Sequence, residues 1–291
     1  MRIAVTGANG FIGRQLCPYL QEHLNADIVA MMRNPDRAGE QILNLSDSDE
    51  NLIARLGNLD CLIHLAARAH SIDSTQTDFD RDNLLLSQRI AHLCDLAKIP
   101  RLIFLSSIKV NGDSTQGRAP YSADEKPQPK DAYGASKLAS EQAIRKRLEN
   151  TQTRVVIIRP PLVYGDHNKG NLGSLGKLIR LRIPLPFGKL KNKRDLVSIE
   201  NLCSLIALVT THPQAVDQIF LVSDGISRTT GEIANLLAER EGIRTTSFSM
   251  PDWTFNLLGL IKPQMIERLT GDLQVDINKT LTLLGWKPHS R

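Results

Sequence analysis

The sequence predicts an α/β protein built on a doubly wound parallel sheet, followed by a small C-terminal lobe. Strand-like and helical segments alternate along the first two-thirds of the chain, and most of the strand-like runs are apolar throughout. Strands that are apolar on both faces and alternate with helices indicate a parallel sheet covered on both sides. After residue 159 the alternation breaks, because glycines and prolines punctuate residues 160–186 and predict a loop-rich segment.

The alternation can be followed segment by segment. Apolar runs predict strands at residues 3–6, 27–32, 42–45, 61–65, 102–106 and 155–159. Helical periodicity predicts helices at residues 11–23, 49–56, 82–97 and 135–150. A helix at 201–211 and a strand at 218–223 are expected to return to the sheet, and the chain from about 228 is helical, with a strand-like stretch at 273–276.

These elements suggest two units. We expect residues 1–160, with about 201–224, to form the main domain. Residues of about 161–200 and 225–291 would then form the lobe over the carboxyl edge of the sheet, where open α/β folds bind ligands.

Composition narrows the class of protein. No apolar run reaches the roughly 18–20 residues that a membrane-spanning helix needs, and the N-terminus enters a strand without the features of a signal peptide. The cysteines are widely spaced and form no CxxC pair, which favours reduced side chains over a disulfide or a zinc site. We therefore expect a cytoplasmic protein with no membrane insertion and no metal. The cysteines are Cys17, Cys61, Cys94 and Cys203.

The net charge of +5 is concentrated in one stretch. Between residues 167 and 194 there is no acid and almost no aromatic residue, so a base-stacking platform for nucleic acid is missing. The stretch suits a small polyanion such as a diphosphate, or it is a solvated basic face. Its basic residues are Lys169, Lys177, Arg180, Arg182, Lys189, Lys191, Lys193 and Arg194.

The first predicted strand leads into a glycine-rich turn and a helix, with the sequence GANGFIG at residues 7–13. In this context Gly7 allows a tight turn, Gly10 lets backbone amides approach a pyrophosphate, and Gly13 lets helix and strand pack closely. The pyrophosphate then faces the positive end of the helix. The arrangement favours a Rossmann-type dinucleotide site over a generic turn.

The end of the second predicted strand bears on the choice between NAD and NADP. An acid normally binds the adenosine ribose there, but residues 30–34 read AMMRN and contain none. Arg33 could instead meet a 2′-phosphate, which favours NADP and leaves NAD open.

Residues 133–137, YGASK, place Tyr133 and Lys137 on one face of a helix, one turn apart. A phenol titrates near pH 10, too high for proton transfer at neutrality, and a nearby ammonium is expected to lower that value. Tyr133 is therefore a candidate general acid and base.

Together these motifs resemble the extended short-chain dehydrogenase/reductase superfamily and its NAD-dependent epimerase/dehydratase family. The segments SSIKVNG (106–112) and DCLIHLAA (60–67) are similar to two further family patterns. The resemblance implies that Ser107 hydrogen-bonds the reacting sugar oxygen and that Lys137 holds the nicotinamide ribose. Asp47 would contact adenine or serve as a helix N-cap, whereas His64 is expected to be structural. The remaining cofactor contacts that it implies are Gly7, Asn9, Gly10, Phe11, Ile12, Gly13, Leu65, Ala66, Ala67 and Asn83.

The second half of the chain resembles nucleotide-sugar epimerases at RPPLVYG (159–165), RDLVSIENL (194–202) and RLTGD (268–272). This implies a UDP-linked sugar whose diphosphate is bound by Arg194, with Arg268 as a second candidate. Three positions depart from related patterns. Leu162 replaces an asparagine, Asn111 replaces a tyrosine, and residues 108–109 lack the Asp-Glu pair that 4,6-dehydratases use.

The resemblance is greatest to bacterial surface-polysaccharide proteins that act at sugar C4 by hydride transfer. The end of the second predicted strand favours NADP over NAD. It therefore slightly favours an enzyme that reduces a UDP-4-keto-hexosamine. The alternative is a UDP-hexose or UDP-N-acetylhexosamine 4-epimerase with tightly bound NAD. A non-catalytic NAD(P)-sensing regulator is a remote third possibility, because such proteins usually lose the tyrosine or lysine. A homodimer through the 82–97 and 135–150 helices is possible, although Glu141, Arg145 and Lys146 would make the outward face of the second helix charged.

Overall fold

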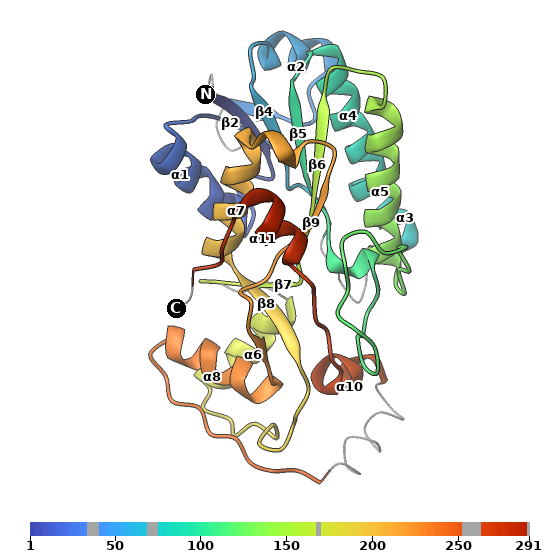
Figure 1. Ribbon diagram of the computed structural model, residues 1–291. Coiled ribbons are helices and arrows are strands. Elements are labelled where there is room, and N and C mark those ends of the chain that lie inside the picture. The colour runs from blue at the N-terminus through green and yellow to red at the C-terminus, as the bar shows by residue number, and fades with distance from the viewer. Residues whose placement is uncertain (34–40, 69–74, 167–169, 252–262, 290–291) are drawn as a thin grey trace.

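The protein is organised around a seven-stranded, all-parallel sheet with the order β3-β2-β1-β4-β5-β6-β9 (Figure 1). The computed structural model describes residues 1–33, 41–68, 75–166, 170–251 and 263–289. The strand order runs outward in opposite directions from β1 and β4, which confirms the doubly wound sheet and places its switch point between these two strands. The strands are β1 (Arg2–Thr6), β2 (Asp27–Met32), β3 (Ile42–Asn44), β4 (Cys61–His64), β5 (Arg101–Leu105), β6 (Arg154–Arg159) and β9 (Ile219–Leu221).

Helices cover both faces of this sheet, and two apolar clusters fill the layers between. On one face α1 (Gly13–Leu24) and α7 (Ile199–Thr211) pack against alternate strand residues such as Ile3 and Val5. On the other face α2 (Asp49–Leu56), α4 (Leu86–Leu96) and α5 (Ala132–Leu148) pack against the intervening residues. Because successive strand side chains point to opposite faces, burial on both sides explains the continuously apolar strands.

The helix predicted at 82–97 begins earlier than expected. Thr75 caps α3 (Gln76–Phe79) through a reciprocal pair of hydrogen bonds with Asp78. The chain continues through a π-helical turn, η1 (Asp80–Leu85), into α4. Residues 75–78 are polar and show no apolar periodicity. The sequence signal for the start of α3 was therefore the capping pair of Thr75 and Asp78.

The segment after β6 is more regular than its glycines and prolines suggest. It contains β7 (Leu162–Tyr164), α6 (Gly170–Arg180) and β8 (Arg194–Ser198), so the prediction of a loop-rich stretch was wrong. The apolar spacing of Leu172, Leu175 and Ile179 was the helical signal. The short strand β10 (Ser227–Arg228) completes a second sheet, in the order β10-β8-β7.

Further helices lie near this second sheet, in the lower part of Figure 1. They are α8 (Thr230–Arg240) and α10 (Pro263–Thr270), and α11 (Asn278–Leu284) packs near β9. The stretch 273–276 makes two isolated bridges, Arg194 with Leu273 and Tyr121 with Val275, rather than a strand. None of the helices in the described ranges combines the length and hydropathy that crossing a bilayer requires. Cys61, Cys94 and Cys203 are buried, whereas Cys17 is half-buried.

Candidate active site

The glycine turn after β1 has a backbone that side chains would block. A Cβ on Gly13 would lie 2.4 Å from the Gly7 carbonyl oxygen. Gly7 has a φ of +70°, and a Cβ there would lie 3.0 Å from the Ala66 Cα, so the turn sits directly against the end of β4. Asn9 at the tip is exposed, and Phe11 and Ile12 are half-buried. The turn is thus a narrow cradle lined by backbone.

The start of α1 suits an anionic group. Among the described residues, Ile12 provides no side-chain cap, and the first turn of α1 contains no acid. By contrast α2, α5, α7 and α8 are each capped by a side-chain oxygen. The Arg14 and Gln15 amides are bonded to the Gly10 and Ile12 carbonyls, so the start of α1 is closed by backbone alone. With no acid or side-chain cap there, the positive end of α1 suits the oxygens of a dinucleotide pyrophosphate.

Thr6 and His64 join the ends of β1 and β4 beside this turn. The Thr6 Oγ1 lies 2.7 Å from His64 Nδ1 and accepts hydrogen bonds from the amides of Leu65 and Ala66, each at 3.1 Å. His64 Nε2 lies 3.1 Å from the Ser87 hydroxyl. Burial lowers the pKa of His64 to about 3, so the ring is neutral and structural, as predicted. Leu65, Ala66 and Ala67 are half-buried along this edge.

A buried carboxylate that sequence reasoning missed, Asp82, gathers arginines at the same edge. It is 5% exposed and contacts Arg33 at 3.2 Å, Arg68 at 2.6 Å and Arg81 at 3.1 Å. The hydrogen bond from Arg81 is the main cause that lowers the pKa of Asp82 to about 2. Arg33 follows β2 and Arg68 follows β4, so Asp82 links the loops on both sides of β1.

Asn83 and Asp47 lie close to this region. The Asn83 side chain accepts a hydrogen bond from the Arg68 amide at 2.7 Å and donates one to the Ser136 hydroxyl at 2.9 Å, which ties η1 to α5. The N-cap interpretation of Asp47 is wrong, because Ser48 caps α2 by accepting a bond from the Asn51 amide. The Asp47 carbonyl accepts a hydrogen bond from Arg89 instead.

The structure brings the three predicted catalytic side chains to one end of α5. Asp131 caps this helix by accepting a bond from the Gly134 amide at 2.7 Å, so Tyr133 lies in the first turn. Tyr133 forms a side-chain hydrogen bond with Ser107, which follows β5 and begins the short helix η2 (Ile108–Val110). Lys137 is 2% exposed, and its Nζ lies 4.1 Å from the centroid of the Phe104 ring.

Proton affinities at this end of α5 differ from those expected. Burial raises the pKa of Tyr133 to about 12, although its hydrogen bond with Ser107 acts in the opposite direction. Burial also lowers the pKa of Lys137 to about 7, and the charge of Glu141 opposes that shift. The expectation that the lysine lowers the pKa of the phenol is therefore wrong for this structure. The cause is that desolvation penalises both charged forms.

The sequence suggested that Glu141 lies on the outward face of α5, but the structure places it inside the protein. It is 3% exposed and forms a bidentate ion pair with Arg159, with Nε–Oε1 at 2.9 Å and Nη2–Oε2 at 2.6 Å. Arg145 and Lys146 are exposed, as expected. The buried face of α5 thus contains a complete ion pair one turn from Lys137.

The substrate candidates lie on the second sheet and its surroundings. Arg194 begins β8 and is half-buried, and its Nη1 donates to the Gly271 carbonyl at 2.9 Å. Arg268 lies in α10, but its side chain is outside the part of the chain that the structure describes. Lys169 is also outside the described residues. The rest of the basic stretch is exposed, and Arg180 pairs with Glu241 at 2.6 Å.

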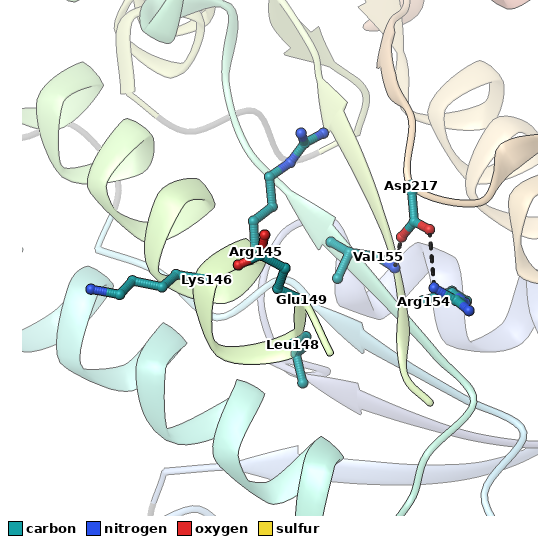
Figure 2. A pocket seen from close by; sticks show the side chains of 7 residues that line it. All are labelled: Arg145, Lys146, Leu148, Glu149, Arg154, Val155 and Asp217. Carbon is teal, nitrogen blue, oxygen red and sulfur yellow. Dashed lines mark hydrogen bonds and ion pairs between the residues drawn. The ribbon is translucent and has the colours of Figure 1, made fainter. Parts of the chain in front are cut away.

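A pocket of about 370 Å³ lies at the other end of α5 (Figure 2). It involves the last turn of this helix and the start of β6, at the amino edge of the sheet. Tyr133 and Ser107 lie at the carboxyl edge, so this pocket is not part of the catalytic cluster. Its lining residues are Arg145, Lys146, Leu148, Glu149, Arg154, Val155 and Asp217.

The close approach of α5 and η2 can be tested at Gly134, where a Cβ would lie 2.5 Å from the Lys109 carbonyl oxygen. Alanine normally stabilises a helix relative to glycine, by about 1 kcal/mol. Here we expect Gly134→Ala to lower the free energy of unfolding by about 1–3 kcal/mol, because backbone must move. Denaturant unfolding measures this change. Gly57→Ala is the control, because no atom lies within 4 Å of its added Cβ, and unchanged or higher stability is expected there. A stabilised Gly134→Ala protein would contradict the tight contact.

Known proteins of similar sequence identify the family of this chain. A model described as NAD dependent epimerase/dehydratase family matches residues 3–223. A UDP-glucose 4-epimerase of Vibrio cholerae is 37% identical over 300 residues, covering 98% of this chain and 90% of the relative. An ADP-L-glycero-D-manno-heptose-6-epimerase of Pseudomonas aeruginosa is 29% identical over 279 residues, covering 86% of this chain and 81% of the relative.

Solved structures show the same fold. MoeE5 in complex with UDP-glucuronic acid and NAD superposes with a TM-score of 0.78 at 22% identity, covering all of this chain and 95% of that one. A UDP-glucuronic acid 4-epimerase from Bacillus cereus in complex with NAD also gives 0.78, at 21% identity, covering 100% and 94%. The chain therefore belongs to the NAD dependent epimerase/dehydratase family, whose cofactor, NAD(P), fits the glycine turn and the uncapped start of α1.

Proposed function

We propose that this protein is a 4-epimerase of a UDP-linked hexose or N-acetylhexosamine. The observation that supports it most is the 37% identity to a UDP-glucose 4-epimerase across 98% of the chain. The sequence slightly favoured a reductase, but the relatives favour the epimerase. Both reactions use the same catalytic side chains, and this is why motifs alone separate them poorly.

Ser107 and Tyr133 are placed to act on one sugar hydroxyl, although burial raises the pKa of the Tyr133 phenol and therefore opposes its ionisation. When bound, the nicotinamide supplies the acceptor and donor of hydride at C4. Ser107 would hydrogen-bond the C4 oxygen, and Tyr133 would take the proton of the C4 hydroxyl and later return it. The present hydrogen bond between Ser107 and Tyr133 indicates that both can reach one sugar oxygen. Ile108 and Lys109 follow Ser107, so the acid pair that helps expel water in 4,6-dehydratases is missing.

Epimerase activity is tested with UDP-glucose and UDP-N-acetylglucosamine as separate substrates. We expect conversion to the C4 epimer without net change in reduced cofactor. Tyr133→Phe should lower the rate by about 10²-fold or more, because a general acid and base is lost. Tyr19→Phe, which removes a phenol from α1, is the control and should keep the parent rate.

Two outcomes would count against this assignment. One NADPH oxidised per UDP-4-keto-6-deoxy-N-acetylglucosamine, with no epimerisation, would favour the reductase. Parent-rate turnover by Tyr133→Phe would exclude the proposed proton transfer. Turnover of any sugar by the parent protein excludes a purely sensory role.

Arg194 is proposed to bind the substrate diphosphate. Its guanidinium is half-buried on β8, whereas Lys191 and most of the basic stretch are exposed, and a guanidinium binds phosphate in a bidentate manner. UDP should raise the melting temperature of the parent protein by mass action. Arg194→Ala should weaken this shift and leave the shift caused by the dinucleotide intact, while Lys191→Ala should resemble the parent. If Arg194→Ala bound UDP with unchanged affinity, the proposed contact between Arg194 and the diphosphate would be contradicted.

The choice of cofactor is proposed to depend on Arg33. This side chain is 54% exposed and already pairs with Asp82, so it can turn to a 2′-phosphate without losing a buried environment. If NADP is preferred, Arg33→Ala should weaken NADP binding by roughly 10–100-fold, the value of one charge-assisted hydrogen bond, with little change for NAD. Arg81→Ala, which removes a different partner of Asp82, is the control. Calorimetric titration measures both affinities, and equal losses for NAD and NADP would refute the role.

A further inference from the structure

Glu141 joins α5 to the ends of two strands inside the protein. Its carboxylate receives the bidentate pair from Arg159, the last residue of β6, and a hydrogen bond from the Ser106 hydroxyl, just after β5. Arg159 Nη1 also donates to Asn111 Oδ1 at 3.1 Å, and Asn111 Nδ2 donates to the Ser122 carbonyl at 3.0 Å. Ser106 directly precedes Ser107, so this network connects α5 to the strand end that carries the catalytic serine.

Lys137 lies one helical turn before Glu141, on the same buried face of α5. The side chain of Lys137 is buried against the Phe104 ring, and its charge helps to lower the pKa of the buried His64 on β4. The charge of Glu141 raises the pKa of Lys137 and so opposes the effect of burial. Both oxygens of Glu141 are engaged by Arg159, so two buried cations share one carboxylate.

Several other charged groups on the described elements packed against α5 have ion-pair partners of their own. Asp82 on η1 is surrounded by arginines, and Lys109 on η2 lies 2.9 Å from Asp113 and 3.5 Å from Asp131. On α4, Asp95 pairs with Arg147 of α5 at 2.9 Å. Glu141 and Arg159 are therefore the two charged residues that we relate to the charge of Lys137.

We propose that Glu141 is a positioning residue that supplies the countercharge of Lys137, and that Arg159 limits how much of this charge Lys137 receives. The catalytic consequence rests on the proposed function, because it matters only if Lys137 acts beside Tyr133. Burial already brings the pKa of Lys137 to about 7. Small changes in the charge that Lys137 receives from Glu141 therefore change its protonation at neutral pH. Arginine remains protonated, so any loss of countercharge falls on the lysine.

The first test measures the titration of Lys137 directly by NMR of protein labelled at lysine Cε. The signal is identified by its loss in Lys137→Met. Glu141→Gln should move the midpoint down by about one pH unit or more, because a buried ammonium loses its countercharge. Arg159→Gln should move it up, because the Glu141 charge is then no longer shared.

Shifts of opposite sign separate the electrostatic role from a merely structural one. Loosened packing would expose Lys137 in both variants and raise both midpoints. Glu141→Asp keeps the charge and should stay close to the parent. Glu149→Gln makes the same chemical change at the distant end of α5, beside the pocket of Figure 2, and should leave the midpoint unchanged.

Two results would overturn the proposal. One is a folded Glu141→Gln protein whose Lys137 titrates at the parent pH. The other is an Arg159→Gln midpoint that does not rise, and this remains decisive if Glu141→Gln fails to fold. If epimerase activity is present, the alkaline limb of kcat should move down with the Lys137 midpoint in Glu141→Gln. Absence of activity in the parent protein would defeat the proposed function but not the titration result.

Discussion

The ion pair between Glu141 and Arg159 is the constraint on which the active site depends. Each side chain is at most 4% exposed, so breaking the pair by removing one partner is expected to cost about 3–5 kcal/mol. A well-packed apolar pair of similar volume could be equally stable, so stability alone does not explain the charges. What this pair adds is placement. It anchors the helix that carries Tyr133 and Lys137 to the strand ends that carry Ser106 and Arg159.

A second constraint acts at the switch point between β1 and β4. Thr6 and His64 join the two strand ends, and the glycine turn packs against Ala66 without room for side chains. Asp82 then links the loops that follow β2 and β4 through Arg33 and Arg68. These contacts leave the uncapped start of α1 facing the same edge as the catalytic cluster. The sheet topology therefore brings the glycine turn and the candidate catalytic residues to the same edge of the sheet, although they are far apart in the sequence.

Membership in the family and the identity of the reaction rest on different features. The family follows from the glycine turn, the tyrosine and lysine of α5, and the match over residues 3–223. In the proposed epimerase, the reaction would depend on how the sugar is held, and we assign that role to the second sheet and its neighbours. Arg194 on β8 is our candidate there for binding a diphosphate, and its contact with Gly271 connects β8 to the chain near the C-terminus.

Local features were readable from the sequence alone. Apolar strands, helical periodicity, the GANGFIG turn and the YGASK motif each lie within a few residues, so they predicted the sheet, the cofactor and the catalytic side chains. Tertiary structure decided what depends on distant partners. Glu141 seemed to belong to a charged surface until Arg159, 18 residues away, placed it inside. Asp82 gained arginines from separate loops, and the pKa of Tyr133 rose because burial outweighed its hydrogen bond with Ser107. Desolvation and long-range pairing arise only when the chain is folded, so no local pattern encodes them.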